Sequence, residues 1–303
     1  MVEVPGDRAG QRLDNFLLGQ LKGAPRSLVY KLVRSGQVRV DGRRAKPETK
    51  LSGGESVRIP PVRLTEAGEA VAPPSGLVAR VADSIVFEDA HLLALDKPSG
   101  IAAHGGSGVS HGAIELLRAA RPGESLELVH RLDRDTSGLL VIAKKRSALT
   151  GLQRLMREGG ITKRYLALLV GRMPDGELRV DVALQKSTLQ GGERMVRADE
   201  GGKDSLSLFR VLERRGGHSF AEVRIETGRT HQIRVHAAHV GHPVAGDPKY
   251  GDREANRRLK DKAGLKRLFL HAASLEFSLG DGRDYLLSAP LPADLSGVLD
   301  RLG

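Results

Sequence analysis

Apolar residues in the first sixty positions follow two different spacings. They recur every three to four positions over residues 13–21 and again over residues 27–36, which is the spacing of a helix with one buried face. Apolar and polar residues then alternate over residues 37–40 and 55–59, as in half-buried strands, and Asp41-Gly42 is a strong turn signal after the first of these. The pattern predicts two helices packed on a small β-sheet.

From residue 85 onward the apolar runs are short and mostly typical of strands. Helical spacing is confined to residues 112–120, 147–157 and 229–240. Strands are predicted at residues 85–87, 92–95, 164–170, 178–184, 205–212, 220–226 and 268–277. Blocks of strands with scattered helices favour an α+β domain, with a largely antiparallel mixed β-sheet flanked by helices and loops.

A stretch without periodicity separates these two regions. It contains Pro60-Pro61 and Pro73-Pro74-Ser75-Gly76, which are typical of an extended connector. The sequence therefore predicts a small N-terminal α/β domain over residues 1–62, a linker over residues 63–84 and a larger domain over residues 85–303.

Charge and composition narrow the range of functions. The chain has 48 Lys and Arg against 37 Asp and Glu, a net charge of +11, and residues 1–60 hold 12 basic and 6 acidic residues. This excess favours an anionic partner such as nucleic acid, although solubilising surface charge is the simpler alternative. The absence of cysteine excludes disulfides, thiolate nucleophiles and Cys-ligated metals. No apolar run approaches the roughly 20 residues of a membrane-spanning helix, and the N-terminus lacks a secretory pattern, so we expect a cytoplasmic protein.

A charged loop, residues 130–138, lies between the apolar runs 126–129 and 139–143. A carboxylate set among arginines stays ionised, because the opposite charge lowers its pKa. Such a carboxylate can act as a nucleophile. Charges that simply pair with one another in solvent explain the loop equally well.

Residues 130–138 resemble, position for position, the signature loop of the pseudouridine synthases that modify large-subunit ribosomal RNA. Residues 95–106, 163–167 and 226–236 match three further motifs of that family. Residues 12–14 and 35–42 are similar to the S4 RNA-binding fold. The resemblance implies a pseudouridine synthase fold with an N-terminal S4 domain. It also implies a monomer that isomerises uridines of 23S ribosomal RNA, free or within a large-subunit precursor particle, without cofactor or metal.

The resemblance also implies roles for individual residues. Asp133 would be the nucleophile, Arg229 its cationic partner, and Tyr165 would stack on the target base and assist proton transfer. Sheet packing for Tyr165 and a phosphate contact for Arg229 remain the alternatives. The uridine must leave the RNA helix to react, and His130 and Arg131 would lie near the pocket that receives it. Further RNA contacts are expected from Arg234, Arg26, Lys31, Arg34, Arg39, Arg43 and Arg44. Asp96 stands where the family often has Asn, and we assign it no role.

Two other functions stay open from the sequence. One is an RNA-binding ribosome assembly factor without catalysis, and the other is a nucleosidase that uses Asp133 with Asp135. A metal site is not favoured, because the histidines after residue 230 lack the His-Glu-x-x-His spacing. The basic residues Lys186, Arg194, Arg197 and the run 257–260 are weaker candidates for phosphate contacts.

Overall fold

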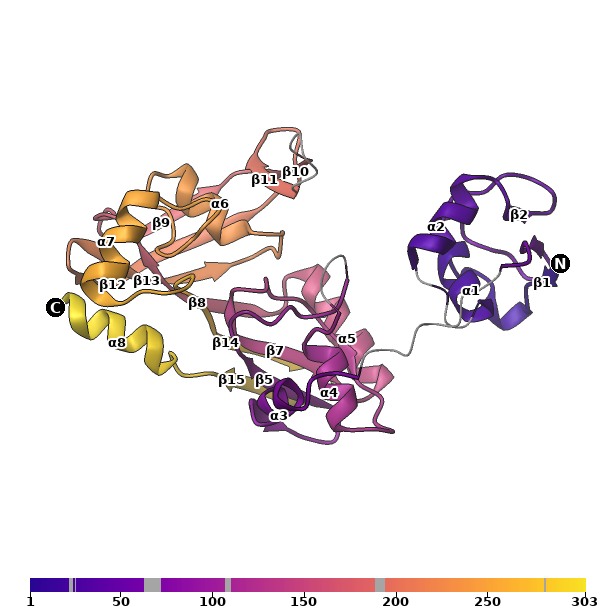
Figure 1. The fold of residues 1–303 in the computed structure, drawn as a ribbon, viewed down its shortest axis with the longest axis horizontal. Coiled ribbons are helices and arrows are strands. Elements are labelled where there is room, and N and C mark those ends of the chain that lie inside the picture. The colour runs from indigo at the N-terminus through magenta and orange to yellow at the C-terminus, as the bar shows by residue number, and fades with distance from the viewer. Residues whose placement is uncertain (22–23, 25, 63–71, 107–109, 189–193, 281) are drawn as a thin grey trace. The chain divides into compact units, whose positions relative to one another are not determined.

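The computed structural model describes residues 1–21, 24, 26–62, 72–106, 110–188, 194–280 and 282–303 (Figure 1). The chain divides into two units, Met1–Ala72 and Pro73–Gly303. No helix in these described ranges is long and apolar enough to cross a membrane.

The first unit is built as its apolar pattern predicts. Helices α1 (Leu13–Gln20) and α2 (Arg26–Arg34) pack with a three-stranded antiparallel sheet in the order β1-β3-β2. These strands are β1 (Val2–Glu3), β3 (Ser56–Arg58) and β2 (Arg39–Val40). Leu13, Phe16 and Val29 are fully buried between the helices and the sheet, and burial of such side chains supplies most of the stabilisation of a small unit.

The second unit is organised around a large mixed sheet. Its main path runs β4-β5-β7-β14-β8-β13-β12-β9, while β6 pairs with β7 and β15 pairs with β14. The strands are β4 (Ile85–Glu88), β5 (Leu92–Lys97), β6 (Glu127–Leu128), β7 (Ser137–Ala143), β8 (Thr162–Leu169), β9 (Glu177–Asp181), β12 (Leu206–Arg215), β13 (His218–Ile225), β14 (Leu270–Leu279) and β15 (Arg283–Ser288). A separate hairpin consists of β10 (Leu184–Thr188) and β11 (Arg194–Ala198). The helices are α3 (Ser75–Ala82), α4 (Ala113–Ala120), α5 (Arg146–Glu158), α6 (Gln232–His239), α7 (Arg253–Ala263) and α8 (Ala293–Leu302).

Strand β7 brings the charged loop into the middle of this sheet. Every residue of β7 is buried, which is why it reads as a continuous apolar run. It pairs antiparallel with β5 and parallel with β14, where Ser137 lies opposite His271. At Gly138 (φ 105°) a Cβ would lie 2.2 Å from the carbonyl oxygen of Ala272, so the close approach of the two strands requires glycine. The loop that precedes β7 is thereby fixed against the core.

Several boundaries differ from the sequence prediction. Residues 75–82, which the prediction placed in the linker, form α3, and Val81 is fully buried against α4 in the second unit. The prolines before them start the helix rather than extend a connector, because Pro74 is its N-cap. Residues 63–71 of the predicted linker lie outside the described residues. The strand predicted at 178–184 is divided between β9 and β10.

Helix α7 was not predicted, because its sequence is almost entirely charged or polar. Its basic run 257–260 lies on a helix rather than in a loop, with Leu259 buried and Arg258 paired with Glu254 at 2.6 Å. These contacts make the run part of an ordinary solvated helix face.

Candidate active site

A cavity in the second unit brings together three of the four sequence segments that matched the family motifs, residues 130–138, 163–167 and 226–236. Asp133 lines it from the loop before β7, and Tyr165 lines it from β8. Arg229 lines it from the segment before α6, and Arg234 from α6 itself. The side chain of Asp133 is 18% exposed. The predicted nucleophile is therefore half-buried in a cavity and does not face bulk solvent.

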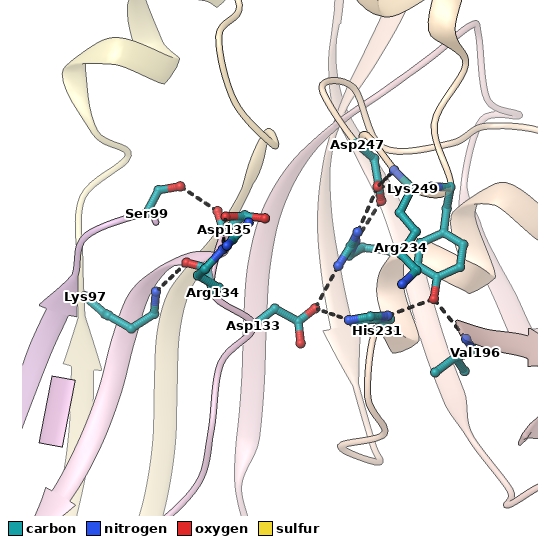
Figure 2. Close-up of polar contacts among 11 residues, drawn as sticks. Lys97, Ser99, Asp133, Arg134, Asp135, Val196, His231, Arg234, Asp247 and Lys249 are labelled. Carbon is teal, nitrogen blue, oxygen red and sulfur yellow. Dashed lines mark hydrogen bonds and ion pairs between the residues drawn. The ribbon is translucent and has the colours of Figure 1, made fainter. Parts of the chain in front are cut away.

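The cationic partner of Asp133 is Arg234. The guanidinium of Arg234 lies 3.3 Å from Asp133 Oδ2, and two further nitrogens donate to the two oxygens of Asp247 at 2.7 and 2.8 Å (Figure 2). The backbone N–H groups of Lys249 and Tyr250 also donate to Asp247. Burial alone would raise the pKa of Asp247, but its hydrogen bonds and the charge of Arg234 hold that pKa below the usual value. Asp247 thus fixes the guanidinium that faces Asp133.

This pairing corrects two of the predictions. Arg229, predicted as the partner of Asp133, is exposed and donates its Nε to the carbonyl oxygen of Asp204 at 3.1 Å, although it lines the same cavity. Arg234, predicted as an RNA contact, is only 6% exposed and engages two carboxylates. The reason is that Arg234 lies in buried α6 beside Asp247, whereas Arg229 precedes that helix.

His231 approaches Asp133 from the start of the same helix. Its Nε2 lies 3.8 Å from Asp133 Oδ2 and its Nδ1 lies 2.8 Å from the hydroxyl of Tyr250, which accepts the backbone N–H of Val196 at 3.0 Å (Figure 2). Burial lowers the pKa of His231 and favours the neutral ring. In a neutral ring one nitrogen donates and the other accepts. An Nδ1 that accepts the hydroxyl of Tyr250 leaves the Nε2–H facing Asp133. His231 also adopts a left-handed conformation (φ 55°), and for this reason α6 begins at Gln232 rather than at residue 229.

Lys97 holds the backbone of the charged loop, residues 130–138. It is fully buried, and its ammonium donates to the carbonyl oxygens of Pro98, Ile101 and Arg134 at 3.0, 2.7 and 3.2 Å. Burial lowers its pKa to about 7. The hydroxyl of Ser99 adds a bond to the carbonyl oxygen of Asp135. Lys97 lies in the family motif at residues 95–106, but no role was predicted for it from the sequence.

Tyr165 lines the cavity from β8, and His130 begins the charged loop of residues 130–138. Burial and the charge of Asp133 raise the pKa of Tyr165, so its hydroxyl stays protonated. The Nε2 of His130 accepts the backbone N–H of Val141 at 3.0 Å, and burial lowers its pKa to about 4. His130 is therefore neutral at pH 7, and its Nε2 secures β7. Arg131 is exposed at the edge of the cavity.

The RNA contacts predicted for the first unit lie mainly on its surface. Lys31, Arg34, Arg43 and Arg44 are exposed, and the guanidinium of Arg39 donates to the carbonyl oxygen of Gly42 at 3.0 Å. Arg26 begins α2, but its side chain lies outside the described residues.

Two further histidines near α6, His236 and His242, bind protein groups. His236 is fully buried and lies 3.0 Å from the hydroxyls of Ser205 and Ser207, and His242 lies 3.0 Å from the carbonyl oxygen of Val170. Among the weaker phosphate candidates, Arg197 pairs with Asp199 at 2.9 Å, and the side chain of Arg194 lies outside the described residues.

Comparison with known proteins supports this assignment of motifs. The family described as RNA pseudouridylate synthase matches residues 91–239, and the S4 domain matches residues 11–57. The chain is 52% identical to ribosomal large subunit pseudouridine synthase C of Escherichia coli (strain K12), over 100% of this chain and 96% of that protein. The chain belongs to the RNA pseudouridylate synthase family. It is also 47% identical to the protein of that name from Haemophilus influenzae, over 100% of this chain and 94% of that protein.

Solved structures show the same family fold. Human RNA pseudouridylate synthase domain containing 4 is 26% identical with a TM-score of 0.61, and 75% of this chain and 95% of that chain are covered. Human RNA pseudouridylate synthase domain containing 1 is 29% identical with a TM-score of 0.58, over 68% of this chain and 82% of that chain. The predicted α+β fold class is thereby confirmed.

Proposed function

We propose that this protein isomerises uridines of 23S, large-subunit, ribosomal RNA to pseudouridine, with Asp133 as the nucleophile. The observation that supports this most strongly is the half-buried Asp133 carboxylate, paired with Arg234 in a cavity that Tyr165 also lines. The names of the relatives supply the class of substrate.

The arrangement suits an isomerisation in which nothing is oxidised. The bond between ribose C1′ and base N1 breaks, the base turns and a bond from C1′ to C5 forms. The proton on C5 is lost and N1 takes up a proton, so the composition of the nucleotide is unchanged. Arg234 and His231 both face Oδ2 of Asp133, which leaves Oδ1 to attack either C1′ or C6 of the base. The uridine reaches that oxygen only after it is extruded from its helix, at a cost of a few kcal/mol of stacking.

The test of the proposal is incubation of the protein with a 23S transcript that carries tritium at uridine C5. An isomerase releases tritium without free uracil. Release of uracil would favour the nucleosidase, and RNA binding without either product would favour the assembly factor. Mapping pseudouridine in ribosomal RNA from cells that lack the gene then identifies the positions.

The proposal extends to the setting of the reaction. We propose a cytoplasmic monomer that acts on large-subunit ribosomal RNA, either free or within a large-subunit precursor particle, in keeping with the name of its relatives. Sedimentation equilibrium tests the monomer, and parallel assays on naked RNA and on precursor particles test the substrate. A dimer would contradict the first statement, and activity on neither substrate would contradict the second.

Replacing Lys31, Arg34, Arg43 and Arg44 together by Gln should weaken RNA binding and flatten its salt dependence. The slope of log K against log salt should fall by about 0.7–0.9 for each phosphate that these side chains no longer neutralise, because fewer counterions are released. The turnover at saturating RNA should not change, since these residues belong to the first unit. Filter binding at several salt concentrations measures the slope, and an unchanged slope would exclude this surface as an RNA contact.

Tyr165→Phe separates stacking from proton transfer, because it removes only the hydroxyl. We expect the single-turnover rate to fall about 10²-fold, at the lower end of the range for loss of a positioned acid or base. RNA affinity should stay within about twofold, since the ring that stacks on the base is retained. A rate equal to that of the parent would assign Tyr165 to packing alone.

A further inference from the structure

A second hollow opens beside the active-site cavity. It shares Arg131, Tyr165 and Arg229 with that cavity, and it continues to Arg157 at the end of α5 and to Lys163 on β8. An RNA strand that places a uridine beside Tyr165 therefore has an adjoining hollow available for a neighbouring nucleotide.

Lys163 is an unusual lysine within this hollow. It is only 5% exposed, yet its ammonium makes no hydrogen bond or ion pair in the described part of the chain. Burial lowers its pKa, and only the charge of Glu226 opposes this effect. Glu226 itself pairs with Arg224 at 3.1 Å. Lys97 offers the contrast, since its buried ammonium is satisfied by three carbonyl oxygens.

The ammonium of Lys163 is not among the fully buried polar atoms that lack a partner, so it reaches the hollow although the rest of the side chain is packed. A largely desolvated charge without a partner gains from a ligand that pairs with it, which points to such a ligand in the hollow. The other charged residues that line the hollow indicate the sign of the charge that the ligand carries. Arg131 and Arg157 form no ion pair within the described residues, while the acidic Glu158 lies 3.9 Å from Arg154. His130, which also lines the hollow, is neutral. The uncompensated charges are therefore cationic, and they suit an anion.

The position of Lys163 relative to Tyr165 indicates which anion. The two residues are two positions apart on β8, so their side chains leave the same face of the strand, about 6.6 Å apart along it. A cation beside an aromatic stacking platform is the usual arrangement for gripping a single strand of nucleic acid by its backbone and its bases.

We propose that Lys163 binds a backbone phosphate of the RNA strand adjacent to the target uridine, in the hollow that adjoins the active-site cavity. This inference rests on the proposed function, because it takes the uridine beside Tyr165 as its reference point. It makes Lys163 a substrate-binding residue that helps to set the position of the strand.

The test uses the full chain and synthetic target RNAs in which single phosphates next to the target uridine are replaced by neutral methylphosphonates. One replacement should weaken binding to the parent protein about tenfold. Lys163→Met should bind unmodified RNA about tenfold more weakly, and the same methylphosphonate should cost it nothing further. Lys163→Arg should restore most of the affinity, and Lys262→Met, an exposed lysine of α7, serves as the matched control.

Each outcome decides between a phosphate contact and a packing role. If Lys163→Met shows the same methylphosphonate losses as the parent, or if only its melting temperature falls, the proposal is overturned. Equilibrium binding needs no isomerisation. The contact between Lys163 and the phosphate can therefore be measured even if the parent protein releases no tritium. Absence of tritium release from the parent would therefore contradict the proposed function and not the phosphate site.

Discussion

Asp133→Asn is expected to reduce the single-turnover rate of pseudouridine formation by at least about 10³-fold, because an amide cannot replace an ionised nucleophile. The asparagine side chain has the same shape as the aspartate that it replaces, so the affinity of the variant for RNA should change by less than about threefold. The measurement is tritium release with the enzyme in excess over RNA, which separates the chemical step from binding and product release.

Asp135→Asn is the matched control, since it makes the same chemical change two residues away. Asp135 lies 3.1 Å from the exposed Arg134, while its carbonyl oxygen accepts from Ser99. We expect this variant to retain a rate within about fivefold of the parent, since only a surface ion pair is removed. Equal losses in the two variants would mean that the loop, rather than the Asp133 carboxylate, determines the rate.

Arg234→Lys is expected to have the second largest effect, on both activity and stability. Lysine keeps the charge but cannot present the planar set of donors that binds Asp247 twice and Asp133 once. Removing one partner of a buried ion pair lowers the free energy of unfolding by about 3–5 kcal/mol. Because lysine keeps the charge, we expect Arg234→Lys to lower it by about half of that. The rate should fall about 10²-fold, because Asp133 loses its fixed cation.

Arg229→Lys in the same cavity is the control, because Arg229 is exposed and its Nε donates to a carbonyl oxygen. Thermal melts and single-turnover rates of the two variants test the difference. A larger loss of rate in Arg229→Lys than in Arg234→Lys would support Arg229 as the cationic partner of Asp133, as the sequence resemblance implied.

The stability of the parent protein should also depend on pH through Asp247. The stability that Asp247 contributes through its lowered pKa is present above its unfolded pKa and is lost as the pH falls through its folded pKa.

Elements with strong local patterns could be predicted from the sequence. Helix α1 and strand β5 were anticipated, because helical spacing and a continuous buried run are local signals. Helix α7 was missed, since the few apolar residues that it buries give too weak a pattern. Helix α3 was missed because the prolines in front of it suggested a connector.

Within the site, the segments were identified correctly but the partners of some residues were not. Arg229 and Arg234 lie five positions apart in one motif, and the choice between them depends on Asp247, a partner thirteen residues beyond Arg234. Lys97 reads as the end of a strand, and its role depends on the carbonyl oxygen of Arg134, 37 residues away. Contacts of this kind are set by the packing of distant segments, which spacing along the chain does not encode.

The most direct test of the account is the structure of the Asp133→Asn protein bound to a target RNA stem-loop. We predict an extruded uridine beside Tyr165, with C1′ or C6 about 3–3.5 Å from the side chain at position 133, and the pair of Arg234 with Asp247 intact. A uridine that stays stacked in its helix, or that occupies a site remote from residue 133, would contradict the account.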